Sequence, residues 1–188
     1  MAVRIEKPQF NLRDKISSLD YIKLPKHKMP EGTVLQTQYV STSAQVTAQN
    51  QHTEVLSLKI NKNKMANAVF IGGNIEYAHS NGNGRFELQA SVDDASSYYK
   101  IHAITGEDDN GVGTYATNNK PFFFLHDPLA VGGNDEEVDT LYYRILFFHH
   151  TQNGGTLYIN RAISNSNADF FAGSCSLWAM EIERWDMI

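Results

Sequence analysis

The feature that most constrains the fold is an alternation of apolar and polar residues that starts at Gly32 and continues almost to the end of the chain. Leu56, Leu58 and Ile60 show it clearly, because a polar residue separates each from the next. This period of two is typical of β-strands with one buried side. We predict nine such strands, at 34–40, 55–62, 69–77, 85–92, 98–105, 121–125, 140–151, 156–163 and 174–183.

Turn-forming residues separate these segments. The sequence SNGNG at 80–84 predicts a hairpin, because Asn and Gly tolerate positive φ. Gly72 and Gly73 interrupt the third strand and predict a bulge there. Many short strands without a helical pattern after Pro30 predict an all-β sandwich of the Greek-key or jelly-roll kind. An immunoglobulin-like sandwich is the alternative, although the single cysteine, Cys175, excludes the paired cysteines of its commonest form.

Two of the predicted strands are apolar on both sides. They are the segments LYYRILFFHH at 141–150 and SLWAMEI at 176–182. Strands of this kind need cover on two sides, and the core of one domain supplies only one. A neighbouring subunit would supply the other, so we expect a closed homo-oligomer.

The charge of the chain changes near Pro30. Of the 16 Lys and Arg and 21 Asp and Glu residues, seven and three lie within residues 1–30, which leaves nine and 18 for the remainder. A basic leader therefore precedes an acidic body. We divide the chain into an N-terminal arm at 1–30 and one β-domain at 31–188, since a single core is normally complete within such a length.

The arm combines prolines with an apolar stripe. Asn11 and Asp14 fit the start of a short helix, and Leu12, Ile16 and Leu19 would share one side of it. A helix of about two turns is not stable alone in water. A disordered tail is one interpretation. The number of apolar side chains favours the other, in which the arm docks on a partner or on sister subunits.

Several function classes find no support in the sequence. No apolar run is long enough to cross a bilayer, and the first residues lack a secretory signal, so we expect synthesis in a cytoplasm and no membrane insertion. The net charge of −5 argues against nucleic-acid binding by the body. The glycine pairs lie in turns and do not form a nucleotide loop. We therefore expect neither nucleic acid nor a cofactor as a ligand.

Residues for catalysis or metal binding are equally sparse. His149 and His150 are adjacent and would point to opposite sides of a strand, so they would not share one metal ion. Cys175 lies within a predicted strand, where a small packed side chain is the simplest interpretation. No serine is framed as in a nucleophile elbow. We predict no catalytic residue, no metal site and no enzyme activity.

Aromatic residues beside the loops offer one further possibility, the stacking of a sugar ring. The candidates are Tyr98, Tyr99 and Tyr115, together with the phenylalanines at 122–124. Packing in the core or at a subunit interface explains these rings more simply. Recognition of a host surface glycan stays as the alternative function.

The two ends of the body resemble a known group of proteins. GTLYINR at 155–161, SCSLWAMEIE at 174–183 and GTVLQTQYV at 32–40 resemble strands of a β-sandwich found in proteins of marine tailed bacteriophages. IEKPQFNLR at 5–13, with LDY at 19–21, resembles a leader that precedes varied bodies in phage structural proteins. The bulky Trp178 and the acidic insertion at 127–139 depart from that pattern. No catalytic residues transfer from it.

The resemblance implies a virion protein whose body is a jelly roll like that of TNF or C1q. It implies a homotrimer on the particle surface, as a head decoration or fibre subunit or as a tail-fibre subunit. The arm would then dock on a capsid or tail protein through charged and apolar residues. Those we assign to docking are Arg4, Phe10, Leu12, Arg13, Lys15, Ile16, Leu19 and Tyr21.

Overall fold

The computed structural model describes residues 32–49, 52–64, 66–80, 84–92, 97–105, 117–127, 139–149, 155–163 and 173–183. These residues form strands and no helix. The strands are β1 (Val34–Thr42), β2 (Val46–Gln49), β3 (Thr53–Asn61), β4 (Ala68–Ser80), β5 (Gly84–Ser91), β6 (Tyr99–Ala103), β7 (Asn118–His126), β8 (Thr140–His149), β9 (Thr156–Ile159) and β10 (Cys175–Ile182). The predicted short helix lies outside the described residues.

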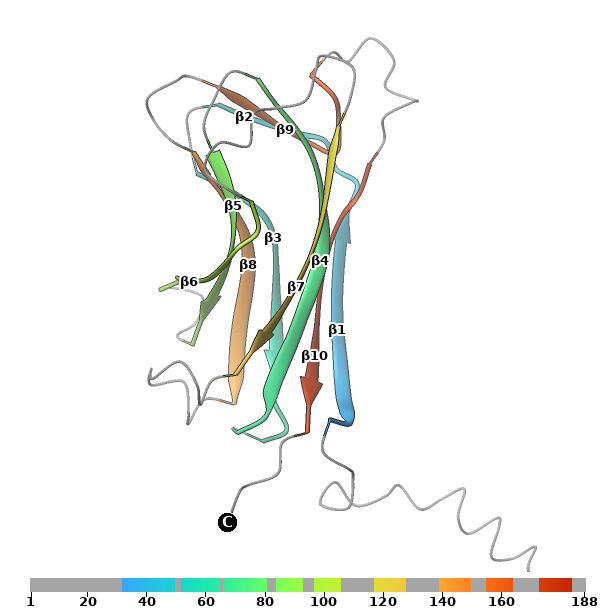
Figure 1. Ribbon diagram of the computed structural model, residues 1–188, viewed down its shortest axis with the longest axis vertical. Coiled ribbons are helices and arrows are strands. Elements are labelled where there is room, and N and C mark those ends of the chain that lie inside the picture. Colours follow the sequence, from blue (N-terminus) through green and yellow to red (C-terminus); the bar gives the residue numbers. More distant parts are fainter. Residues whose placement is uncertain are drawn as a thin grey trace, which may run out of the picture.

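The strands form two antiparallel sheets that face each other (Figure 1). In the first sheet β10 lies between β1 and β4, and β7 pairs with the other edge of β4. The long β4 extends past β10 and there pairs with β9, which in turn pairs with β2. The second sheet has the order β3-β8-β5-β6. The predicted all-β class and two-sheet sandwich are confirmed.

Most of the strand pairs are nested along the sequence. β1 pairs with β10, β3 with β8, β4 with β7 and β5 with β6, and successive pairs alternate between the two sheets. The chain therefore behaves as a long antiparallel ribbon that is rolled up, with its two ends in adjacent strands. Because of this, the start of β1 and the end of β10 lie at one end of the sandwich, which we call the arm-bearing pole (Figure 1).

The core confirms the period of two. Alternate residues of each strand point inward, and aromatic rings from the two sheets meet between the sheets. Tyr77 of β4 packs edge to face against Phe86 of β5 with centroids 4.6 Å apart, and Phe86 lies 4.9 Å from Phe147 of β8. All three are nearly inaccessible to solvent. Cys175 is also buried in this core, as predicted.

The predicted bulge at Gly72 and Gly73 is wrong. Gly72 is aligned with Trp178 and Phe123, and Gly73 with Leu177 and Phe122, without a register shift on either side. The glycines are needed for space instead. A Cβ at Gly72 would overlap the indole of Trp178, and one at Gly73 would overlap the carbonyl oxygen of Ser176. Strand glycines often mark such close approaches.

The predicted strand at 156–163 ends early, because β9 stops at Ile159 and Asn160 turns away with a φ of 57°. The side-chain amide of Asn160 donates to the carbonyl oxygens of Thr42 and Ala44, at 3.0 Å each. Its backbone N–H donates to the carbonyl of Glu76 at 2.9 Å. This buried residue therefore joins the end of β1, the middle of β4 and the end of β9.

We predict that Asn160→Ala lowers the free energy of unfolding by about 2–3 kcal/mol, because the carbonyls of Thr42 and Ala44 lose their donor and alanine tolerates positive φ poorly. Asn160→Gly is the matched control, since it loses the same amide but adopts positive φ without strain. Urea unfolding followed by circular dichroism measures both. A wild-type free energy for both variants would show that this junction adds nothing to stability.

Candidate functional site

The most unusual surface of the described residues is the outward side of β1, β10, β4 and β7. Residues aligned across a sheet point to the same side, and Tyr39, Trp178, Gly72 and Phe123 form one such row. Met180, Phe70 and Leu125 form the next row. We call this surface the aromatic face and define it by Val34, Tyr39, Phe70, Phe123, Leu125, Trp178 and Met180.

Four side chains of the aromatic face are exposed to solvent, and Phe70, Trp178 and Met180 are half-buried. Tyr39 is 65% exposed, Phe123 63%, Leu125 55% and Val34 48%. The rings contact one another. Phe70 lies edge-on to Trp178 with centroids 5.4 Å apart, and Phe123 lies 6.2 Å from Trp178 and 6.4 Å from Phe70. Contiguous apolar surface of this kind marks an interaction site in soluble proteins.

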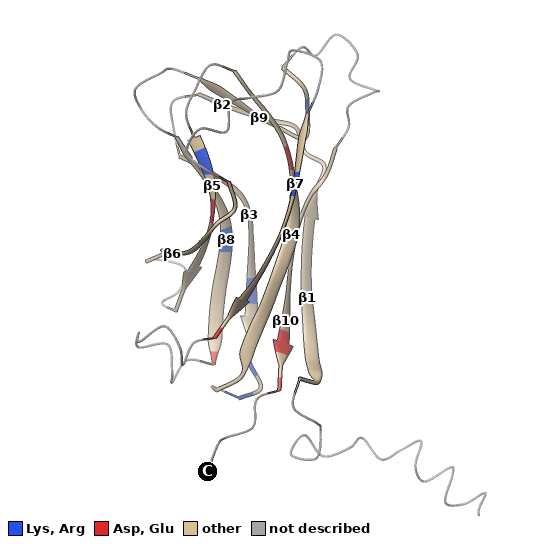
Figure 2. Cartoon of the chain, in the orientation of Figure 1, with Lys and Arg blue, Asp and Glu red and all other residues tan. Residues whose placement is uncertain are grey.

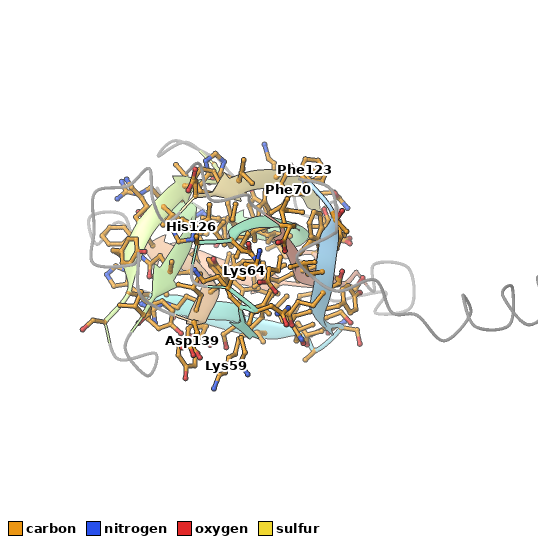
Figure 3. All side chains as sticks on the ribbon, turned by 90° about the horizontal axis from the view of Figure 1, so that it is seen from below. Lys59, Lys64, Phe70, Phe123, His126 and Asp139 are labelled. Atoms are coloured by element: carbon orange, nitrogen blue, oxygen red, sulfur yellow. The ribbon has the colours of Figure 1, made fainter. Side chains whose placement is uncertain are left out.

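The aromatic face carries no charge. Between Val34 and Ser41, Ser176 and Ile182, Ala68 and Asn74, and Pro121 and Leu125, none of the outward residues is Lys, Arg, Asp or Glu. The lower parts of β1, β4 and β7 are tan in Figure 2 for this reason. Figure 3 shows Phe70 and Phe123 on one side of the sandwich and Lys59 and Asp139 on the other.

Gly72 gives the aromatic face its shape. It has no side chain, so the indole of Trp178 lies over its backbone, and a Cβ there would displace the ring. Trp178 thereby contacts both Phe70 and Phe123, edge-on to the first and tilted to the second. Its orientation is fixed before any partner arrives.

The outward side of the second sheet is organised differently. Each of its aromatic rings lies under a cation: Arg144 over Tyr98 at 3.8 Å, Arg85 over Phe148 at 4.7 Å and Lys59 over Tyr142 at 5.3 Å.

Polar partners complete this charged face. Glu87 accepts hydrogen bonds from Arg85 and Gln89, and Arg144 donates to Gln89 at 2.9 Å. The strand at 141–150 therefore has the second cover that its sequence requires, but the chain's own side chains supply it.

Two of the tyrosines proposed to face a glycan, Tyr98 and Tyr99, point to different sides of the second sheet. Tyr98 points outward under Arg144, whereas its neighbour Tyr99 packs toward the core. Burial, followed by the charge of Glu54, raises the pKa of Tyr98 above its usual value, although nearby Arg144 lowers it. Tyr115 lies outside the described residues. Of the phenylalanines at 122–124, only Phe123 belongs to the aromatic face.

A buried carboxylate organises the arm-bearing pole. Glu181 at the end of β10 is inaccessible to solvent and accepts five hydrogen bonds, from β1 and from residues 63–67. The donors are the Asn63 backbone N–H (2.6 Å) and amide (2.5 Å), the amides of Asn67 (2.6 Å) and Gln36 (2.7 Å), and the Lys64 N–H (3.3 Å). Burial raises the pKa of Glu181, but these hydrogen bonds outweigh it and hold the pKa below the usual value.

The same pole holds the two ends of the described body together. The Gly32 N–H donates to the carbonyl of Glu183 at 3.0 Å, and the Glu183 N–H donates to the carbonyl of Thr33 at 2.9 Å. The carboxylate of Glu183 pairs with Lys64. The described part of the body therefore begins, at Gly32, and ends, at Glu183, at the same place. The predicted docking residues, from Arg4 to Tyr21, lie outside the described residues and stay a prediction.

Two structural findings bear on other ligands. Within the described ranges no three His, Cys, Asp or Glu side chains are grouped so that they could hold a metal ion. The same residues contain no helix long and apolar enough to span a membrane.

Comparisons with known proteins give limited likeness. No protein-family model matches the sequence, and no curated protein matches it. The infectious bursal disease virus VP2 subviral particle overlaps with a TM-score of 0.41 at 14% identity, over 80% of this chain and 38% of that one. The T13 particle of the same virus gives 0.40 at 15%, over 79% and 36%. This chain spans under two-fifths of their length, and such TM-scores do not establish a shared fold.

We predict that Glu181→Gln lowers the free energy of unfolding at neutral pH by about 1–3 kcal/mol. The NH2 group of glutamine would face N–H donors, which it cannot accept from, so buried hydrogen bonds would be lost. Since folding lowers the pKa of Glu181, its contribution is present above the ordinary carboxyl pKa and is lost as the pH falls through the lowered value. Wild type should therefore lose more stability than the variant between about pH 5 and pH 3.

Urea unfolding at a series of pH values measures this difference. Glu54→Gln is the control, because that carboxylate is exposed on the charged face, 3.6 Å from Arg144. Parallel pH curves for wild type and Glu181→Gln would contradict the role of the buried carboxylate.

Proposed function

We propose that this chain is a surface-exposed structural subunit of a tailed-phage virion, a trimeric decoration or fibre protein that its arm anchors to the particle. The body at 31–188 faces outward, and residues 1–30 dock on a capsid or tail protein. Head decoration and tail fibre are both within this proposal. It assigns the chain no enzyme activity.

The strand order supports a jelly-roll body. Two sheets built from nested antiparallel pairs, with the first strand beside the last, are the arrangement of a rolled double Greek key. The segments of the body that resemble phage proteins include β1, β9 and β10, all of which belong to the first sheet. The resemblance thus concerns one connected region and not scattered pieces.

The observation that carries the proposal is the arm-bearing pole. Gly32 and Thr33 are hydrogen-bonded to Glu183, so the basic leader continues from one extremity of the sandwich. Attachment through the leader would leave the opposite end of the body and both outward faces free. A subunit displayed on a particle needs this arrangement, in which the tether and the displayed surfaces do not compete for space.

The arm has the chemistry of a docking peptide. Arg4, Arg13 and Lys15 would meet acidic groups of the partner, and charge complementarity of this kind sets orientation and association rate. Phe10, Leu12, Ile16, Leu19 and Tyr21 would enter a groove, as the apolar side of a short helix does.

We predict that deleting residues 1–30 leaves a folded body with the same oligomeric state that no longer joins particles. The full-length variant Arg4→Glu/Arg13→Glu/Lys15→Glu should also be depleted from particles, because its charges would repel an acidic partner. Lys59→Glu, a charge reversal on the body, is the matched control and should be incorporated normally. Immunoblots of purified particles give the occupancy.

If the truncated protein decorates particles at full occupancy, the arm is not the anchor. Absence of the wild-type protein from particles would contradict the virion function itself.

A further inference from the structure

We infer that the aromatic face binds a second copy of this chain, with the copies arranged around an axis that runs along the strands. The choice of partner rests on the proposed function, because an anchored subunit has its own copies as neighbours. Trp178, Phe123 and Tyr39 would form the centre of the contact. The charged face of the second sheet would remain in water.

The size of the aromatic face fits a homo-oligomer. The face spans 27 residues of four strands, at 34–41, 68–74, 121–125 and 176–182. With strands about 4.8 Å apart and a rise of about 3.3 Å per residue, these cover roughly 430 Å². A stable interface buries about 800 Å² per partner, and about 65% of that area is apolar in homodimers. The aromatic face therefore supplies most of the apolar part of one subunit's share, and the residues around it would supply the rest and the polar rim.

The residue types fit as well. Tyr, Trp, Phe and Met are enriched in the centres of interfaces, from which charged residues are depleted. Trp178 is already held over Gly72 and in contact with two phenylalanines, so its burial costs little conformational entropy. Side chains of this kind, central and pre-ordered, carry most of the binding energy in measured interfaces.

The lack of charge argues against other occupants. A face that lies on a membrane carries Lys or Arg beside its apolar residues, and the aromatic face has neither among its outward positions. An uncharged face also has little means of selecting a foreign protein by charge. Copies tethered side by side by their arms, however, meet at a high effective concentration.

The arm-bearing pole fixes the direction of the axis. With the axis along the strands, every copy presents the Gly32–Glu183 junction at the same end, so all arms can reach one surface. An antiparallel arrangement of the copies would place arms at both ends of the assembly. The face and the pole are thus compatible only in a parallel assembly.

The test is the mass of the full-length chain in solution, measured by light scattering and native mass spectrometry over a range of concentrations. We expect wild type to be oligomeric and Phe123→Asp to dissociate, with a dissociation constant raised on the order of 100-fold or more by the unpaired buried charge. Tyr39→Asp should act in the same direction. Both side chains are largely exposed within one chain, so their replacement leaves the core intact.

His52→Asp is the matched control. Its ring is exposed and stacked on Phe148 at the charged face, so it should keep the wild-type mass. Circular dichroism confirms that each variant is folded. A monomeric wild type at micromolar concentration, or a wild-type mass for Phe123→Asp and Tyr39→Asp, would overturn the inference.

The two proposals fail separately. If wild type is oligomeric and Phe123→Asp is monomeric, the inference stands even when neither protein is found on particles, and only the virion function is contradicted. If wild type is incorporated into particles but all variants keep its mass in solution, the aromatic face does not bind a second copy and the virion function stands.

Discussion

The pairing of β1 with β10 is the constraint on which the other features depend. It places Val34 opposite Ile182, so the first and last strands of the body lie side by side in one sheet. The same alignment puts Tyr39 beside Trp178 and brings Gln36 to the buried carboxylate of Glu181. A charge buried there is tolerated only because amides from β1 and from residues 63–67 surround it. The pairing of β1 with β10 therefore forms the arm-bearing pole and also brings a hydrogen-bond donor, Gln36, to Glu181.

The two outward faces cover their apolar rings by different means. On the second sheet, Lys59, Arg85 and Arg144 each lie over a ring, and Glu87 and Gln89 satisfy the two arginines. On that face Arg85 and Arg144 already have hydrogen-bond partners within the chain. On the first sheet the rings cover only one another and the backbone of Gly72. The same fold thus presents one face suited to solvent and one suited to burial, and the sequence difference lies in a few charged residues.

Local features were predictable from the sequence, and those that depend on distant partners were not. The period of two identified β3 and β4, because which side of a strand is buried is a local property. β2 was missed because its four residues, VTAQ, are too few for their alternation to stand out, and only Ala48 among them is buried. Gly72 and Gly73 suggested a bulge, since a strand glycine fits either a bulge or a close approach, and only the distant Trp178 decides between them.

The candidate site was predictable in part for the same reason. The apolar outward residues of 176–182 and the ring of Phe123 were recognised as interface material. Tyr39, Phe70 and Leu125 were not, because nothing local shows that β1, β4 and β7 adjoin β10 on one sheet. In the isolated body this face leaves aromatic surface exposed, and contiguous exposed apolar surface favours association. Packing of the Trp178 indole on Gly72 reduces the exposed aromatic surface of the single subunit. The same contact orients the ring, so a partner can bind it with little loss of side-chain entropy.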